Sequence, residues 1–413
     1  MNILYVSQFF YPERAAAAIR AYENAKIWTS LGHSVTLFTG YPNFPTGRIF
    51  EDYKVKLLEK EEIEGIKVIR NKVIAKPNTT KILRAVSYFS FTFFSLWNIF
   101  FNKKHIKSNY DVVLGTSGTV FAPIPAYLYA KLNKIPFVLE LRDITYKQLL
   151  ATGSSKKSIS YKLIRFLELS LCKRARAIVT LTEGFRRELL EEGIEEQKIH
   201  VIPNGFNLEK ESQDKTNSQE LVISYFGTFG YSQDLTRVIN ILNGVHVRDR
   251  KIKLIFIGDG AERDKLLNYK NKEGISNLEF LSSMPQNDLE KFYEISDFCV
   301  VALKNNKMFR NTIPSKLFEI MGRRKPLIFF GPEGEASLII RKSKAGISLT
   351  SEDDIQNREL LGRLLNELVD SGCLECQKKE YGGNGYNYVR ENYNRQTLAE
   401  KYLQILKSIM GKI

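Results

Sequence analysis

One short stretch combines residue types that could bind a phosphate and a hydroxyl group together. It runs Asn311-Thr312-Ile313-Pro314-Ser315-Lys316-Leu317-Phe318-Glu319-Ile320-Met321-Gly322 and predicts a loop followed by a helix, with Thr312 as N-cap and Pro314 in the first turn. The N–H groups of a helix start attract anions, and Lys316 adds a positive charge beside them. Glu319 lies about 7.5 Å further along the helix axis than Pro314, where it could accept a hydrogen bond from a sugar hydroxyl. A nucleotide has this shape, although these residues alone also fit an ordinary packed helix.

Length and composition indicate what class of protein contains this stretch. The chain has 413 residues, which favours two domains, and its 43% hydrophobic and 26% charged residues are typical of a globular protein. Its four cysteines include one C-x-x-C pair, Cys373 and Cys376, whereas a zinc site needs four ligands. We therefore expect no metal site and reduced thiols. The first residues lack a signal-peptide pattern, so we expect a cytoplasmic protein.

The positive charge is concentrated in the first half of the chain. The net charge is +15, and residues 1–205 hold 30 Lys and Arg against 18 Asp and Glu. Such a basic half indicates either nucleic acid or an anionic membrane surface as a partner. Because no recognised nucleic-acid-binding motif is present, we favour the membrane surface over nucleic acid.

The first half reads as a parallel α/β domain. Apolar runs at 2–8 and 34–39 flank an expected helix over 15–31, which makes a βαβ unit. Ligands of such sheets bind at the carboxyl ends of the strands. The loops after these two strands, and after the run 135–141, supply polar and aromatic candidates that could hold a ligand or only stabilise the loops: Tyr11, Glu13, Tyr41, Asn43, Arg48, Arg142 and Asp143.

The second half begins again as a doubly wound fold after a polar linker at 206–219. Apolar runs at 221–226, 253–257, 278–281, 298–302 and 327–330 predict its strands. The first is followed by Gly227-Thr228-Phe229-Gly230, a loop whose backbone could approach a phosphate. Neither this loop nor Gly258-Asp259-Gly260 completes the G-x-G-x-x-G pattern, so NAD is disfavoured. We expect domains at 1–205 and 220–396, and a final amphipathic helix at 397–413 that could cross back to the first domain.

Residues 85–101 form an unusual segment of seventeen residues without a charge, rich in Phe, Tyr and Trp. This length is at the lower limit for a membrane-spanning helix. Ser87, Ser90, Ser95 and Asn98 fall within one arc of a helix, and Lys103-Lys104 follow it. A helix in the membrane interface and a helix in the domain core both fit this pattern.

Taken together, these residues resemble the retaining family-4 glycosyltransferases of the GT-B fold. The similarity extends to the branch that builds O-antigen and capsule repeat units, typified by N-acetyl-fucosamine transferases. It covers essentially the whole chain and rests on the order and spacing of several motifs: Tyr11-Pro12-Glu13, Gly32-His33-x-Val35, Thr39 to Pro45, Arg142-Asp143, Ile202-Pro203-Asn204-Gly205, Gly258-Asp259-Gly260 and Pro314 to Glu319.

The resemblance implies two Rossmann-like doubly wound domains facing a cleft, with the acceptor on the first and the nucleotide sugar on the second. Glu319 would bind the ribose hydroxyls. The family's paired glutamate falls at Asn311, and the basic residues of its first glycine loop are absent here, so Lys304, Arg310 or Lys316 would replace them. The implied donor-binding set is Gly227, Thr228, Ser282, Met284, Lys304, Arg310, Asn311, Pro314, Ser315, Lys316, Leu317 and Glu319.

The resemblance also implies the chemistry. Catalytic roles fall to Glu13, Arg142, Asp143 and Lys316, and acceptor contacts to Tyr11, Tyr41, Asn43 and Arg48. The donor would be a UDP-linked, N-acetylated hexose, including 6-deoxy forms, and the acceptor a sugar on a polyprenyl diphosphate. No cofactor or metal is implied, because N–H groups and Lys or Arg stabilise the leaving diphosphate. The enzyme would work at the inner face of the cell membrane. The alternatives are a GT-B-shaped sugar-nucleotide epimerase and a noncatalytic polysaccharide-assembly protein.

Overall fold

The computed structural model describes residues 1–13, 15–44, 46–76, 81–106, 109–151, 154–207 and 220–410. The chain divides into two compact units. The N-terminal unit comprises Met1–Asn204 and Arg395–Ile413, and the C-terminal unit comprises Gly205–Asn394. Most of the expected linker, residues 208–219, lies outside the described residues.

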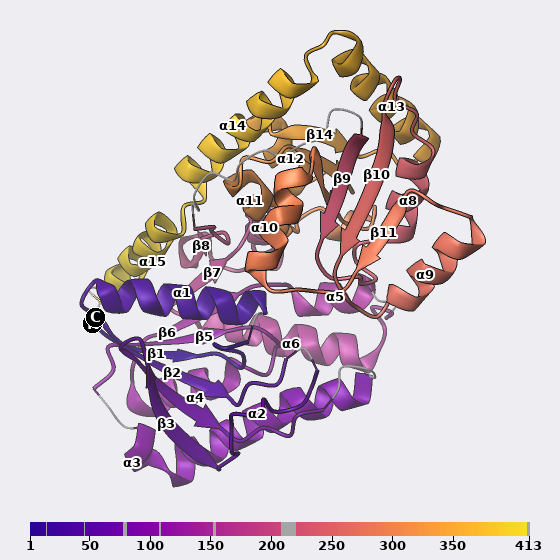
Figure 1. The fold of residues 1–413 in the computed structure, drawn as a ribbon. Helices are drawn as coiled ribbons and strands as arrows, with labels where there is room; N and C mark the ends of the chain where they lie inside the picture. Colours follow the sequence, from indigo (N-terminus) through magenta and orange to yellow (C-terminus); the bar gives the residue numbers. More distant parts are fainter. Residues whose placement is uncertain are drawn as a thin grey trace. The chain divides into compact units, whose positions relative to one another are not determined.

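The N-terminal unit is built on an eight-stranded sheet with the order β3-β4-β2-β1-β5-β6-β7-β8 (Figure 1). All neighbouring strands are parallel except β3 and β4, which form an antiparallel hairpin. Glu64 and Gly65, both with positive φ, form the turn of this hairpin. The strands are β1 (Asn2–Val6), β2 (Ser34–Gly40), β3 (Leu58–Ile63), β4 (Ile66–Asn71), β5 (Val112–Thr116), β6 (Phe137–Leu141), β7 (Ala177–Thr180) and β8 (Ile199–Val201).

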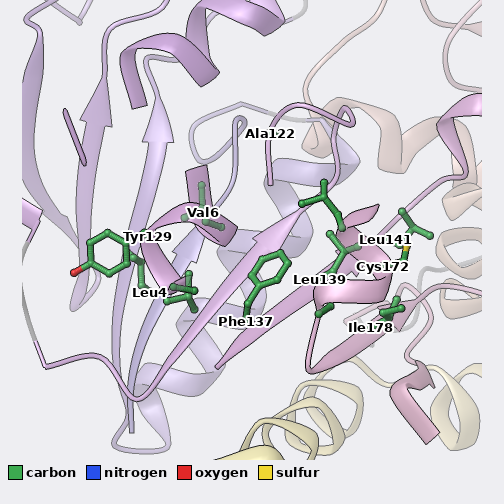
Figure 2. Close-up of a cluster of buried hydrophobic side chains, with 14 of the residues drawn as sticks. Leu4, Val6, Ala122, Tyr129, Phe137, Leu139, Leu141, Cys172 and Ile178 are labelled. Atoms are coloured by element: carbon green, nitrogen blue, oxygen red, sulfur yellow. The ribbon is translucent and has the colours of Figure 1, made fainter. Parts of the chain in front are cut away.

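Alternate residues of β1 show how the two faces of this sheet are covered. Ile3 and Tyr5 pack with Trp28 and Tyr402 in one cluster, whereas Leu4 and Val6 belong to a second cluster, part of which Figure 2 shows. The first cluster is covered by α1 and α15, and the second by α2, α4 and α6. The helices of this unit are α1 (Ala16–Ser30), α2 (Lys81–Phe101), α3 (Lys103–Ile106), α4 (Ile124–Asn133), α5 (Thr145–Ala151), α6 (Ile159–Arg174), α7 (Glu183–Glu191), η1 (Glu196–Lys198) and α15 (Arg395–Met410).

The C-terminal unit contains a six-stranded, fully parallel sheet with the order β11-β10-β9-β12-β13-β14. Its strands are β9 (Glu220–Phe226), β10 (Lys251–Ile257), β11 (Leu278–Leu281), β12 (Phe298–Ala302), β13 (Leu327–Phe330) and β14 (Gly346–Leu349). Its helices are α8 (Leu235–Asn243), α9 (Arg263–Lys272), α10 (Gln286–Ile295), η2 (Lys307–Phe309), α11 (Ser315–Gly322), α12 (Glu335–Ser343), α13 (Asp354–Asp370) and α14 (Leu374–Asn392). The expectation of two Rossmann-like doubly wound domains is confirmed.

The aromatic helix α2 has its polar residues on the inside. Ser87, Ser90, Ser95 and Asn98 are at most 5% exposed, and Asn98 donates to Asn71 Oδ1 over 2.7 Å. On the opposite side, the larger aromatic side chains face outward, with Phe93 50% and Trp97 44% exposed. Neither of the two expected arrangements describes α2 fully, because one face is core and the other is exposed and aromatic. Among the described helices, none is both long and apolar enough to span a membrane.

Candidate functional site: the carboxyl edge of the C-terminal sheet

The residues expected to bind the donor lie after successive strands of the C-terminal sheet or on α11. Gly227 and Thr228 follow β9, Ser282 and Met284 follow β11, and Lys304 follows β12. Because all strands of this sheet are parallel, these loops share its carboxyl edge, where doubly wound sheets bind ligands.

Helix α11 begins one residue later than its first-turn proline suggested. Pro314 is the N-cap, with extended backbone (φ −62°, ψ 132°) and no side-chain hydrogen bond, and Ser315 is the first helical residue. The expectation of Thr312 as N-cap is therefore wrong, because the extended Pro314 separates Thr312 from the helix. The N–H groups of Ser315 and Lys316 lie in the first turn, where no helical carbonyl can accept their hydrogen bonds.

Glu319 is held in a cluster of three partners. Its Oε2 lies 2.7 Å from Lys316 Nζ, and its Oε1 accepts a hydrogen bond of 3.1 Å from the hydroxyl of Tyr293. Nη1 of Arg323 lies 3.5 Å from the same oxygen. Burial alone would raise the pKa of Glu319, but Lys316 and Arg323 bring it below the ordinary value of 4.5. The carboxylate is thus ionised at neutral pH and able to accept hydroxyl hydrogen bonds.

Close backbone contacts fix the loops around α11. A Cβ on Gly258 would lie 1.8 Å from the carbonyl oxygen of Gly227, and one on Gly334 would lie 2.2 Å from that of Arg310. Glu335 N, at the start of α12, donates to this same Arg310 oxygen over 2.7 Å. Only glycine fits at these two positions, and the loops after β9, β10, β12 and β13 consequently pack together.

Lys304 links the loops after β9 and β12. Its backbone N donates to Ser232 O over 2.7 Å, and its Nζ donates to the hydroxyl of Tyr231 over 2.6 Å. Arg310 and Ser282 are exposed at the same edge, and Met284 is half-buried. The edge therefore presents three cationic side chains, Lys304, Arg310 and Lys316, next to a helix start.

Glu13 in the N-terminal unit has a structural role that the sequence did not reveal. The carboxylate accepts hydrogen bonds from the backbone N–H groups of Phe10, Asn43 and Phe44, at 3.1, 2.8 and 2.9 Å. Burial raises its pKa despite these bonds. Glu13 thus ties the loop after β2 to the loop after β1, with two of the bonds at Oε1 and one at Oε2.

The expected acceptor-binding residues separate into buried and exposed pairs. Tyr41 is fully buried, and its hydroxyl donates to Glu59 Oε2 over 2.8 Å. Asn43 is 6% exposed and donates to Tyr41 O. Acceptor contacts by the side chain of Tyr41 are therefore ruled out, because this ring belongs to the core. Tyr11 and Arg48 are exposed, and Tyr11 stacks on Tyr22 with ring centroids 4.9 Å apart.

Arg142 and Asp143 follow β6 at the carboxyl edge of the N-terminal sheet. Arg142 is 7% exposed, its backbone N donates to Ser117 Oγ over 3.0 Å, and its Nη1 is buried without a hydrogen-bond partner in the described part of the chain. The next residue, Asp143, is exposed. The pair is thus placed at the ligand-binding edge of this sheet, as the strand pattern predicted.

Sequence reasoning missed two residues of the Glu319 cluster. Arg323 lies one turn after Glu319 on α11, so the i,i+4 spacing was a usable signal. Tyr293 belongs to α10, and no local pattern links it to Glu319. A search of the described residues finds no group of three or more His, Cys, Asp or Glu side chains that could hold a metal ion.

Known structures define the fold class. Sucrose-phosphate synthase from Thermosynechococcus elongatus superimposes with a TM-score of 0.73 over 100% of both chains, at 13% identity. HepE from Anabaena, in complex with UDP and glucose, gives a TM-score of 0.67 over 99% of this chain and 100% of its own, at 14% identity. The chain therefore has the GT-B fold.

Sequence comparisons define the activity. Residues 16–205 match the glycosyl transferase 4-like domain, and residues 207–382 match the glycosyl transferases group 1 domain. The probable glycosyltransferase WbjE of Pseudomonas aeruginosa is 25% identical over 73% of this chain and 76% of its own. The putative colanic acid biosynthesis glycosyl transferase WcaI of Escherichia coli K12 is 20% identical over 78% and 81%. The chain combines the two domains of these families and is a glycosyltransferase.

Proposed function

We propose that this glycosyltransferase moves an N-acetylated hexose from a UDP-sugar to a glycan carried on a polyprenyl diphosphate, with retention, in surface polysaccharide synthesis. The observation that carries the proposal is the ionised Glu319, held beside Lys316 in the first two turns of α11. A single nucleotide could place its diphosphate at the start of α11 and its ribose at the carboxylate of Glu319. HepE, which shares the fold, binds UDP in its crystals, and this supports UDP as the nucleotide.

The charges on α11 suit departure of a nucleoside diphosphate. In the proposed step, the acceptor hydroxyl oxygen forms a bond to the anomeric carbon as the bond from that carbon to the β-phosphate oxygen breaks. The proton of the hydroxyl passes to the leaving phosphate on the same face, so that no protein base is needed. Lys316, Arg310 and the N–H groups of Ser315 and Lys316 stabilise the growing negative charge and make a metal unnecessary.

The exposed face of α2 supports a membrane-bound acceptor. Val86, Phe89, Phe93, Trp97, Phe100 and Phe101, which we call the aromatic face, are between 39% and 70% exposed. Single exposed apolar residues are common, but a contiguous aromatic surface on a monomer marks an interaction site. Lys103 and Lys104 follow the aromatic face and are exposed, which suits anionic lipids. We therefore propose that the N-terminal unit rests on the inner face of the cell membrane through this face.

The polysaccharide context rests on the relatives. WcaI is named for colanic acid biosynthesis, a name that fits a transferase extending a lipid-linked repeat unit. Asn311, which stands where the resembled family has a glutamate near the donor sugar, leaves the sugar itself to be found by experiment.

A donor screen tests the proposal. UDP-linked N-acetylhexosamines and their 6-deoxy forms, with GDP-linked and dTDP-linked sugars for comparison, are incubated with the enzyme and a short polyprenyl-diphosphate sugar. We expect transfer from a UDP-sugar, with the anomeric configuration kept, as read by NMR. Isomerisation of the donor without any acceptor would instead indicate an epimerase. Neither transfer nor donor hydrolysis from any sugar nucleotide would indicate an assembly protein.

A further inference from the structure

We propose that a pocket between the C-terminal ends of α4 and α6 binds a phosphate-bearing anion. This pocket, which we call the amino-edge pocket, has a volume of about 400 Å³, within the range of small-molecule sites. Five of its lining residues carry a positive charge and none carries a negative charge: Lys131, Lys173, Arg174, Arg176 and Lys198. The proposal does not depend on the identity of the donor or acceptor.

The amino-edge pocket is separate from the carboxyl edge of the N-terminal sheet. Ile135 and Pro136 line it directly before β6, and Ala175 and Arg176 line it directly before β7. Arg142 follows the other end of β6, and a strand of this length spans about 15 Å. An anion in the pocket would therefore not occupy the region of Arg142 and Asp143.

Helix dipoles account for only part of this charge. Lys131 is in the last turn of α4, and Lys173 and Arg174 are in the last turn of α6, where cations are favourable. Arg176 and Lys198 lie outside both helices, so that neither helix end explains their presence in the pocket. Like charges from separate segments repel one another unless an anion offsets them.

Arg176 and Lys198 have internal partners, so the uncompensated charge of the pocket rests on Lys131, Lys173 and Arg174. Lys198 Nζ pairs with Glu195 at 2.6 Å, and Nη1 of Arg174 donates to the carbonyl of Ser170 at 3.0 Å. Lys131 and Lys173 have no ion-pair partner among the residues that the structure describes. The carbonyl contact of Arg174 uses one donor of a guanidinium that carries five.

The floor of the pocket is apolar. Tyr127 and Phe137 meet edge to face, with ring centroids 5.7 Å apart, and Ile135 and Ala175 complete the lining. A cationic rim over an aromatic floor suits an anion with a small apolar portion next to its phosphate, such as a glycerol phosphate. This chemistry occurs both in free phosphoesters and in phospholipid headgroups.

The surroundings of the pocket are compatible with either source. Helices α4 and α6 pack on the same face of the sheet as α2. Both expose apolar residues, with Leu132 of α4 54%, Ile159 of α6 84% and Phe166 of α6 66% exposed. Leu132 directly follows the lining residue Lys131, so a lipid whose headgroup enters the pocket has at least this exposed apolar side chain near its chains. Binding of a headgroup rests on the proposed membrane docking of the N-terminal unit. Binding of a free phosphoester does not.

The test compares wild type with Lys131→Glu/Lys173→Glu in the full chain. The matched control, Lys251→Glu/Lys272→Glu, makes the same charge change on exposed lysines of the C-terminal unit. Binding of sn-glycerol 3-phosphate is measured by calorimetry in the presence of UDP, which fills the donor site. Binding to vesicles is measured by flotation, with phosphatidylglycerol in phosphatidylcholine and with phosphatidylcholine alone.

We expect the pocket variant to lose affinity for its anion by about tenfold or more, and the control to keep it within about twofold. Loss of glycerol phosphate binding assigns a free phosphoester, and loss confined to phosphatidylglycerol vesicles assigns a headgroup. Equal behaviour of wild type and pocket variant in both assays overturns the proposal, as does an equal loss in pocket variant and control. Should the glutamate variant fail to fold, Lys131→Gln/Lys173→Gln gives the same comparison.

Discussion

The carboxylate of Glu319 and the ammonium of Lys316 lie 2.7 Å apart, one turn from each other on α11. In the proposed complex each would exchange this partner for the donor, with the ribose hydroxyls at Glu319 and the diphosphate at Lys316. The ion pair thus holds both side chains in place before the donor arrives. Two predictions separate their roles.

Glu319→Ala should weaken UDP binding by about tenfold to a hundredfold, because a hydrogen bond to a charged group contributes about 1.5–3 kcal/mol. The control is Glu290→Ala, because Glu290 also pairs with Arg323, at 2.9 Å, but comes from α10. Its UDP affinity should change by less than about threefold. Calorimetry with UDP measures both. Unchanged affinity in Glu319→Ala would show that this carboxylate does not hold the ribose.

Lys316→Ala should reduce turnover by about a hundredfold while the affinity for uridine stays close to that of wild type. The reason is that Lys316 meets the charge that develops on the diphosphate, which uridine lacks. Lys307→Ala, an exposed lysine of η2 outside the expected donor set, is the control. Initial rates are measured with the sugar nucleotide found in the donor screen. Full activity of Lys316→Ala, with or without added magnesium, would rule out this role.

Glu168 predicts a pH-dependent stability of the N-terminal unit. This residue is 2% exposed, and its Oε1 accepts hydrogen bonds from the N and Oγ1 of Thr145, at 3.1 and 2.7 Å. Burial raises its pKa to about 7, from an ordinary value of 4.5. The carboxyl of Glu168 therefore holds its proton more tightly in the folded state than in the unfolded state. Its contribution to the free energy of unfolding is complete below pH 4.5 and is lost as the pH rises through 7.

Relative to Glu168→Gln, the free energy of unfolding of wild type should fall by about 2 kcal/mol between pH 5 and 7. Urea unfolding at several pH values measures this difference. Glu183→Gln changes an exposed glutamate of α7 and should follow the wild-type curve. Parallel curves for wild type and Glu168→Gln would show that Glu168 has an ordinary pKa in the folded protein.

The strands of both sheets could be predicted from the sequence because their patterns are local. The apolar runs at 298–302 and 327–330 coincide with β12 and β13. Continuous apolar runs are typical of parallel strands that are buried on both faces. The short strands β8 and β14 were not predicted, since their sequences, Ile-His-Val and Gly-Ile-Ser-Leu, contain no continuous apolar run.

Contacts between distant segments explain what the sequence could not show. Nothing near Tyr41 reveals that its hydroxyl donates to Glu59 of β3, so the sequence leaves open whether this aromatic residue holds a ligand or packs the loop. The backbone N–H groups that donate to Glu13 come from the loop after β2 as well as from its own loop. The sequence shows that Asn98 lies in the polar arc of α2. Only its hydrogen bond to Asn71 of β4 shows that this arc is the buried side of the helix.

The orientation of α2 leads to the last prediction. Phe93→Asp/Trp97→Asp places two charges on the aromatic face, at side chains that are 50% and 44% exposed. Each aromatic side chain that leaves a membrane interface loses about 1.5–3 kcal/mol, and each added negative charge is repelled by anionic lipids. We expect the partition of the protein into phosphatidylglycerol vesicles to fall by about a hundredfold or more. Transfer to a water-soluble acceptor analogue should be unchanged.

Two further variants make this result specific to the aromatic face. Leu338→Asp/Ile355→Asp makes the same charge change at exposed apolar residues of α12 and α13, and should bind vesicles as wild type does. Ser95→Asp places one charge on the buried face of the same helix, where Ser95 is fully buried, and should instead lower the thermal stability. A folded Phe93→Asp/Trp97→Asp protein that still floats with vesicles would locate the docking surface elsewhere. If this variant unfolds as Ser95→Asp does, the aromatic face packs within the protein and the proposed membrane contact is wrong.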